Sequence, residues 1–273
     1  MPTFHQKLAS SWRKNDSLLC VGIDPDHKRL PKHLFDCDKP YFEFGKAIVD
    51  ATAAYVCAFK PQAAHFAAAA REDELALLIA YVKKHYPDLQ VILDAKRGDV
   101  GSTAKLYAKE AFERYNADAV TVSPYLGKDS LEPYFEYSER GIIVLCRTSN
   151  PGSDWLQNSE DQTTPIYLKI AKQVKEWDNH GQCMLVTGAT YPEELARVRE
   201  VVGAMPLLVP GVGAQGGSVQ EVLHHGQDAQ GQGLVISSSR AILFADSGVG
   251  FGEAAAAVAR STMEEINKYR QIN

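Results

Sequence analysis

Two carboxylates and one ammonium group lie within six residues of this 273-residue chain, at Asp94, Lys96 and Asp99. Residues 89–93, just before them, are mostly branched and apolar, which predicts a buried strand. Side chains two residues apart on a strand share a face, so Asp94 and Lys96 point the same way. Gly98 lets the chain turn, and Asp99 then aims back at Lys96 or away toward a neighbour. Because burying charge is costly, the cluster is either a satisfied ion pair that ends a strand or the charged centre of an active site.

The elements that must position this cluster follow a regular pattern, in which short apolar runs alternate with segments of helical periodicity. The runs cover residues 18–23, 55–59, 91–93, 119–122, 142–146, 184–187, 207–209 and 234–237. Eight strand–helix units predict an α/β fold of the (β/α)8 TIM barrel type, because eight parallel strands close into a barrel. Phe4, Leu8 and Trp12, each four residues apart, predict an extra N-terminal helix that covers the barrel bottom. With no linker or repeat in the sequence, residues 1–273 are predicted to form one domain.

Apolar stripes predict individual helices over residues 72–86, 192–202 and 252–269. Ser102 is the expected N-cap of the helix that follows the charged cluster. The longest connection without an apolar pattern runs from residue 147 to 164. A loop of that length in a compact domain is more often a functional segment, such as a lid, than a tolerated surface insertion.

The composition is that of an ordinary globular protein, with 45% hydrophobic residues, 23% charged residues and a net charge of −5. The absence of a long basic run argues against nucleic acid or an anionic membrane as partner. No apolar stretch approaches the roughly 20 residues of a membrane span, and residues 1–17, which lack an uninterrupted apolar core, are not expected to form a signal peptide. Four of the five scattered cysteines lie in apolar strand-like runs, so we expect reduced thiols and a cytoplasmic protein.

A barrel enzyme builds its active site where the carboxyl ends of the strands converge, so the residues that end each run are candidates. Polar and charged side chains gather at these ends. They are Asp24, Lys60, Asp94, Lys96, Asp99, Ser123, Arg147, Thr148 and Ser149, the glycine-rich segment 210–217, and Ser237 to Arg240. Two lysines facing three carboxylates predict an alternating charge network.

The segment 211–216 matches the G-x-G-x-x-G pattern of dinucleotide-binding proteins. That kind of site also needs an acidic residue at the end of the next strand, and the next run ends in Ser239-Arg240 instead. We therefore expect no nicotinamide cofactor. Barrels often bind phosphate with the loops after strands 7 and 8, so the glycine backbone and the Arg240 guanidinium predict a phosphate site.

Metal and triad chemistry are not supported by the residue pattern. No H-x-x-x-H or H-E-x-x-H spacing occurs, and Lys96 supplies positive charge among the carboxylates, so no metal is expected. Ser123 and Ser149 have no histidine at a matching position, which argues against a Ser-His-Asp triad.

Taken together, these motifs resemble the orotidine 5′-phosphate decarboxylase family, in particular its longer bacterial (type 2) branch. The most specific element is Asp94-x-Lys96-x-x-Asp99 followed by Thr103. The supporting segments lie in the family's order over nearly the whole chain. They are Gly22-Ile23-Asp24-Pro25, Phe59-Lys60-Pro61-Gln62, residues 148–152, residues 210–217, and Ser238-Ser239-Arg240. Arg97-Gly98 departs from the bulkier pair of other branches, at no catalytic position.

The resemblance implies conversion of orotidine 5′-phosphate to UMP and CO2 in de novo pyrimidine biosynthesis, without a cofactor. It assigns Lys96 as the donor of a proton to C6 of the pyrimidine, in a network completed by Lys60, Asp94 and Asp99. It also implies a homodimer with shared active sites, in which Asp99 and Thr103 reach the partner's ribose. The implied substrate-binding residues are Asp24 at the ribose, Thr103, Ser149 at the pyrimidine edge, and Gln215 and Arg240 at the phosphate.

Two alternatives stay open at this point. One is a metal-dependent sugar-phosphate decarboxylase or epimerase of the same barrel class, against which the paired Lys60 and Lys96 argue. The other is a non-catalytic nucleotide-binding barrel, which would have little use for an intact charge network.

Overall fold

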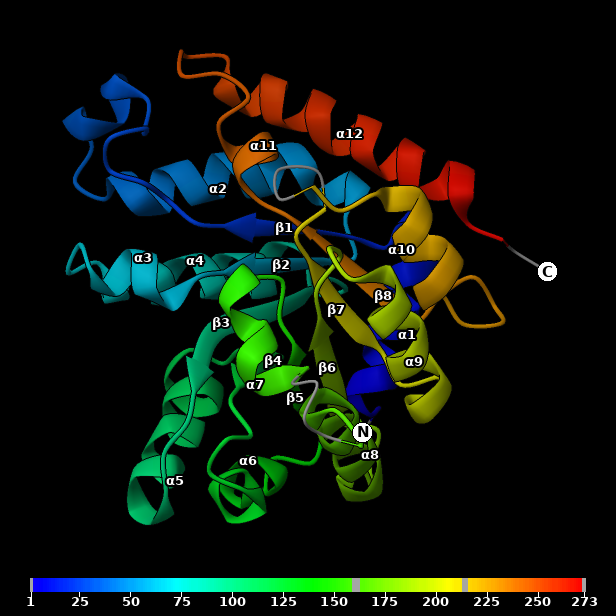
Figure 1. Ribbon diagram of the computed structural model, residues 1–273. Coiled ribbons are helices and arrows are strands. Elements are labelled where there is room, and N and C mark those ends of the chain that lie inside the picture. The colour runs from blue at the N-terminus through cyan, green and yellow to red at the C-terminus, as the bar shows by residue number, and fades with distance from the viewer. Residues whose placement is uncertain (1, 159–162, 213–215, 272–273) are drawn as a thin grey trace.

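The computed structural model describes residues 2–158, 163–212 and 216–271. Its parallel strands pair in chain order and close into a barrel, as the sequence predicted (Figure 1). The strands are β1 (Leu19–Ile23), β2 (Ala58–Pro61), β3 (Gln90–Arg97), β4 (Ala119–Val122), β5 (Gly141–Arg147), β6 (Cys183–Thr187), β7 (Leu207–Pro210) and β8 (Leu234–Ser238). The predicted bounds of β4 are confirmed, whereas β3 extends four residues further than predicted and includes Asp94 and Lys96.

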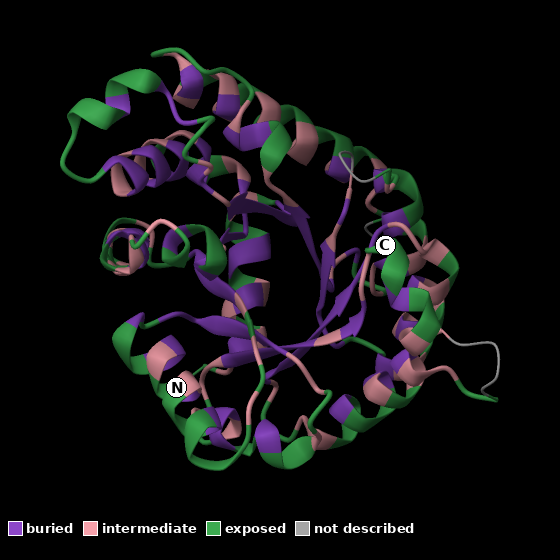
Figure 2. Ribbon diagram, turned by 60° about the vertical axis from the view of Figure 1, so that its left-hand side comes forward, coloured by how far each residue is buried: buried purple, intermediate pink, exposed green. Residues whose placement is uncertain are grey.

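Helices surround the barrel and cover its outer face. They are α1 (Phe4–Asn15), α2 (Pro40–Thr52), α3 (Ala63–Ala67), α4 (Glu72–His85), α5 (Gly101–Lys109), α6 (Glu132–Phe135), α7 (Asp154–Gln157), α8 (Ile166–Trp177), α9 (Pro192–Val202), α10 (Val219–Gly226), α11 (Arg240–Leu243) and α12 (Phe251–Tyr269). Figure 2 shows buried strands enclosed by helices whose outward faces are exposed. Apolar stripes on the inward faces, such as Leu75, Leu78, Ile79 and Val82 of α4, pack into the core.

The N-terminal helix α1 closes the end of the barrel opposite the carboxyl ends of the strands, which confirms its predicted place. Phe4, Leu8 and Trp12 are buried on its inner face. Gly141, the first residue of β5, lies against Phe4, and a Cβ there would come within 2.6 Å of the ring. The barrel bottom is therefore sealed by packing, and the open end is the end where the strands finish.

One predicted helix start is wrong. The helix after β3 begins at Gly101, its N-cap is Val100, and no side chain makes the cap hydrogen bond, so Ser102 is not the cap. Gly101 has a φ of +54°, which turns the chain into the helix one residue earlier than the serine. The helix widens after Lys109, where a π-helical turn covers Glu110–Arg114.

The described helices include none that is both long enough and apolar enough to cross a lipid bilayer.

Candidate active site

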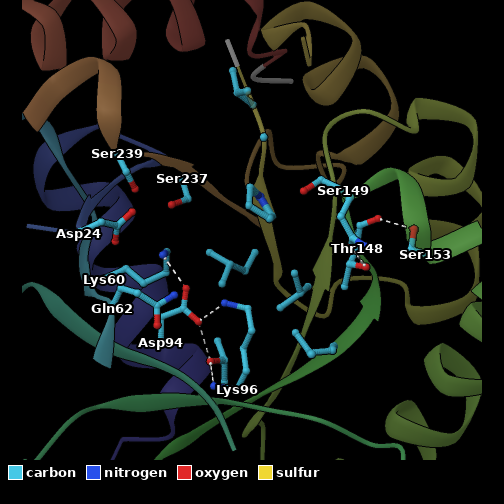
Figure 3. Close-up of a pocket in the computed structure, with 18 of the residues that line it drawn as sticks. Asp24, Lys60, Gln62, Asp94, Lys96, Thr148, Ser149, Ser153, Ser237 and Ser239 are labelled. Carbon is cyan, nitrogen blue, oxygen red and sulfur yellow. Dashed lines mark hydrogen bonds and ion pairs between the residues drawn. The ribbon is translucent and has the colours of Figure 1, made fainter. Parts of the chain in front are cut away.

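A cavity of about 580 Å³ opens at the carboxyl ends of the strands, the place expected for the active site of a barrel. Of the nine residues to which the family resemblance gives a role, six line it: Asp24, Lys60, Asp94, Lys96, Ser149 and Arg240. Figure 3 shows the first four on one side of the cavity and Ser149 across from them. The predicted constellation is thus brought together in one concave site by loops far apart in the sequence.

Asp94 is the centre of the charged cluster. One carboxylate oxygen, Oδ2, accepts a hydrogen bond from Lys60 Nζ at 2.8 Å, and the other, Oδ1, accepts one from Lys96 Nζ at 2.6 Å (Figure 3). Burial opposes the charged form of Asp94, but the two ammonium groups outweigh it and hold the pKa of this carboxyl well below its usual range. Asp94 therefore stays ionised, and its charge fixes both lysines.

The two lysines differ in their access to the cavity. Lys60 is only 6% exposed, whereas the side chain of Lys96 is 48% exposed. Burial disfavours the charge on Lys60, yet the carboxylates of Asp94 and Asp24 more than offset it and raise the pKa of Lys60 above its ordinary value. Lys60 is thus a fixed cation that holds the cluster, and Lys96 is the ammonium that a bound molecule meets.

Asp24 adds a second carboxylate to the cavity wall. Its Oδ1 is buried and has no hydrogen-bond partner among the described residues. In Figure 3 it lies beside Ser239, at the end of the site where β1 and β8 finish. Unpaired buried oxygens are costly, so this one is suited to accept a hydrogen bond from a bound hydroxyl group.

Two of the predicted site residues do not belong to this chain's own cavity. Asp99 is half-buried beyond the Gly98 turn, and its carboxylate accepts a hydrogen bond from the Val100 backbone N–H at 2.8 Å. Thr103 is exposed on α5. Neither lines the cavity, so of the two directions open to Asp99, the structure favours the one away from Lys96.

The predicted phosphate site lies at the ends of β7 and β8, and the structure describes all of it except residues 213–215. Pro210, Gly211 and Val212 after β7, together with Ser238 to Ala241 after β8, line one end of the cavity. Arg240 is exposed there, at the first turn of α11. Gln215 lies outside the described residues.

The segment predicted as a lid covers the opposite wall of the cavity. It contains α7, and its Ser149, Asn150 and Trp155 line the site. Part of the connection, 159–162, lies outside the described residues. The segment contributes a short helix and several side chains to the cavity wall, which favours a functional role over a tolerated surface insertion. Its closure over a ligand stays a prediction.

Arg147 anchors the base of this segment, a role that the sequence did not reveal. The guanidinium is completely buried, forms an ion pair with Asp154 of α7 at 2.5 Å, and lies over the Tyr191 ring at 3.5 Å. Glu194 of α9 lies 3.7 Å from it. Paired in this way, the buried arginine links α7 to α9. It also fixes the start of the loop that carries Ser149.

Gly188, just after β6, lets the Ser149 backbone reach the cavity. A Cβ at this position would lie 2.8 Å from both Cα and Cβ of Ser149, too close for any other residue. The position of Ser149 therefore depends on a glycine in the neighbouring loop, a contact that sequence spacing cannot indicate.

Thr121 is a further site residue that the sequence analysis missed. It lines the cavity beside Asp94 and donates a hydrogen bond to Asp94 Oδ1 at 2.9 Å. The available signal was a single hydroxyl residue in the otherwise apolar strand Ala119–Val122.

No group of three or more histidine, cysteine, aspartate or glutamate residues that could hold a metal ion occurs in residues 2–158, 163–212 and 216–271. Both oxygens of Asp94 are already hydrogen-bonded to ammonium groups.

Comparison with known proteins gives the family. The model of the "Orotidine 5′-phosphate decarboxylase / HUMPS family" matches residues 17–255. The chain belongs to this family. It is 54% identical over 268 residues to the orotidine 5′-phosphate decarboxylase of Ralstonia nicotianae, an alignment that covers 98% of this chain and 99% of the relative. The relative of the same name from Dechloromonas aromatica is also 54% identical, with 98% and 100% covered.

Solved structures agree with the family assignment. The OMP decarboxylase of Leishmania donovani is 36% identical and superposes with a TM-score of 0.85, covering 98% of this chain and 99% of that one. A protein from Toxoplasma gondii described as a putative orotidine-monophosphate decarboxylase is 32% identical, with a TM-score of 0.88 and 98% and 97% covered. Family and barrel, both expected from the strand-end motifs, are confirmed.

Proposed function

We propose that this chain decarboxylates orotidine 5′-phosphate to UMP and CO2, as the names of its relatives suggest, and so acts in pyrimidine nucleotide biosynthesis. The observation that carries the proposal is the buried Lys60–Asp94 pair, which presents the Lys96 ammonium to the cavity. A cation fixed in this way can stabilise negative charge that develops on a bound molecule. A binding module would gain little from it.

The chemistry follows from where the electrons go. When the C6–carboxylate bond breaks, CO2 leaves and the electron pair stays on C6 as a carbanion that the ring does not delocalise as an enolate. Lys96 donates a proton to C6, becomes a neutral amine and regains its proton from water. Because its ammonium is already held on Asp94, little reorganisation is needed when the charge appears. This accounts for a reaction without a cofactor.

The remaining cavity residues bind and orient the substrate in this proposal. Asp24 and Lys60 hold the ribose hydroxyls, and Ser149 hydrogen-bonds the pyrimidine edge from the loop after β5. Arg240 and Gln215 bind the phosphate. Since the phosphate is remote from C6, its binding energy serves to organise the site and close the 147–164 segment.

A purified sample tests the proposed function directly. The ultraviolet absorbance of orotidine 5′-phosphate should change toward that of UMP when the protein is added, and EDTA should leave the rate unchanged. Orotidine 5′-phosphate that stays intact would reject the proposal. A rate that EDTA abolishes would favour a metal-dependent barrel enzyme instead.

Arg240→Ala should weaken both binding and turnover of the phosphorylated substrate, because a hydrogen bond to a charged group contributes about 1.5–3 kcal/mol. The same variant should matter little for orotidine, which lacks the phosphate. Arg260→Ala, which removes an exposed arginine on α12, is the matched control and should change neither substrate's kinetics. Equal losses for the two substrates would show that Arg240 does not bind the phosphate.

We also propose a cytoplasmic homodimer in which each active site is completed by the partner. Asp99 and Thr103 lie outside their own cavity, and the apolar side chains around them are exposed: Val100 and Leu106 near and on α5, and Tyr125 and Leu126 after β4. An exposed apolar patch of this kind is typical of an interaction surface. A second copy related by twofold symmetry would bury it twice and bring Asp99 to the partner's ribose. The five cysteines are free thiols, which suits a reducing compartment.

Mixing two inactive variants tests the shared site. In a hybrid dimer of Lys96→Ala and Asp99→Ala chains, one site carries both defects and the other carries neither. Subunit exchange should therefore restore up to half of the wild-type activity per hybrid dimer. Lys96→Ala mixed with Asp94→Ala is the matched control, because both residues act in their own chain and no activity should return. If exchange is demonstrated and the first mixture stays inactive, Asp99 does not act across the interface.

A further inference from the structure

Thr121 occupies the point where β3 leaves its regular pairing with β4. Leu93 pairs with Val120 and Arg97 pairs with Val122, so four residue steps on β3 face two on β4. Thr121 is the β4 residue opposite this bulge, and it is 1% exposed. The bulge holds Asp94, Ala95 and Lys96, and it replaces the strand alternation that the sequence predicted for this stretch.

The Thr121 hydroxyl takes the place of the missing ladder bonds. Its oxygen accepts hydrogen bonds from the backbone N–H of Ala95 at 3.0 Å and of Lys96 at 2.9 Å, and its own hydrogen is donated to Asp94 Oδ1 at 2.9 Å. A hydroxyl has one donor and two acceptor positions, so all three are used. One side chain thus fixes the backbone of Lys96 and the carboxylate that holds its ammonium.

Lys96 needs such support because its backbone is strained. Its φ is +43°, in the left-handed region that non-glycine residues enter only when their surroundings require it. The backbone N–H that Lys96 donates to the Thr121 hydroxyl belongs to this strained residue. In this conformation Lys96 Nζ lies 2.6 Å from Asp94 Oδ1, with the side chain open to the cavity.

We infer that Thr121 is a positioning residue for proton delivery: it holds the β3 bulge so that the Lys96 ammonium meets the substrate carbon in one fixed orientation. The inference rests on the proposed function for the identity of the reaction, and it assigns no contact with the reacting atoms to Thr121. The Thr121 hydroxyl keeps the backbone of Lys96 in a strained conformation, and this preorganises the ammonium for the reaction.

The test compares Thr121→Val, Thr121→Ser and, as a matched control, Thr187→Val. Valine keeps the shape and removes the hydroxyl, whereas serine keeps the hydroxyl. Thr187 is also buried at a strand end, but its hydroxyl has no hydrogen-bond partner among the described residues. Decarboxylation kinetics, UMP affinity and crystal structures are measured for each.

Thr121→Val should lower kcat by about a hundredfold, the scale of a small misplacement of a reacting group. UMP affinity should change little, because the phosphate and ribose contacts remain. Thr121→Ser should recover most of the lost rate, and Thr187→Val should match the wild type. The crystal structure of Thr121→Val should show Lys96 out of its positive-φ conformation or its ammonium displaced from Asp94.

A Thr121→Val variant with wild-type kcat, or one that loses UMP affinity as much as rate, would overturn the inference. So would a crystal structure of it in which the φ of Lys96 and its contact with Asp94 are unchanged. The crystal structures decide the positioning role even if the wild type fails to decarboxylate orotidine 5′-phosphate, an outcome that would instead reject the proposed function.

Discussion

The structure of the site depends on one buried carboxylate that is shared by two ammonium groups. Asp94 is 5% exposed and would be costly to ionise alone, but Lys60 and Lys96 each hydrogen-bond one of its oxygens. Because each lysine is bonded to a different oxygen of the same carboxylate, the three side chains are fixed as a unit. Of the three, Lys96 is the half-exposed side chain, so its ammonium is the charge that a molecule in the cavity contacts.

The barrel supplies this unit with supports from elements distant in sequence. Thr121 of β4 holds the bulge of β3, and Arg147 at the end of β5 ties the segment that carries Ser149 to α9. Arg97, at the end of β3, forms an ion pair at 2.9 Å with Glu110, the residue that follows α5. This contact holds α5, and with it Thr103, against the barrel. Rigid strands and these few buried polar contacts, rather than the cavity-lining loops alone, set the geometry of the site.

Much of this could be predicted from sequence because it depends on local pattern. The bounds of β4 and of α9, 192–202, follow from apolar runs and periodicity, and the strand-end rule gathers Asp24, Lys60 and Asp94. What escaped prediction depends on tertiary contacts. The bulge at Lys96 needs a hydroxyl from another strand, and the burial of Arg147 needs Asp154 and Tyr191. Ser102 had the right type for a cap, but Gly101 turns the chain before it.

The central claim, that Lys96 supplies both the charge and the proton, is tested most directly by the turnover of Lys96→Ala. We expect a loss of at least about 10²–10³-fold in kcat, the scale of removing one preorganised stabilising group, with UMP binding and the unfolding midpoint retained. Lys60 and Asp94 remain as a buried pair in this variant, so its fold should persist. Activity within about tenfold of the wild type, a difference of only about 1.4 kcal/mol, would contradict the account.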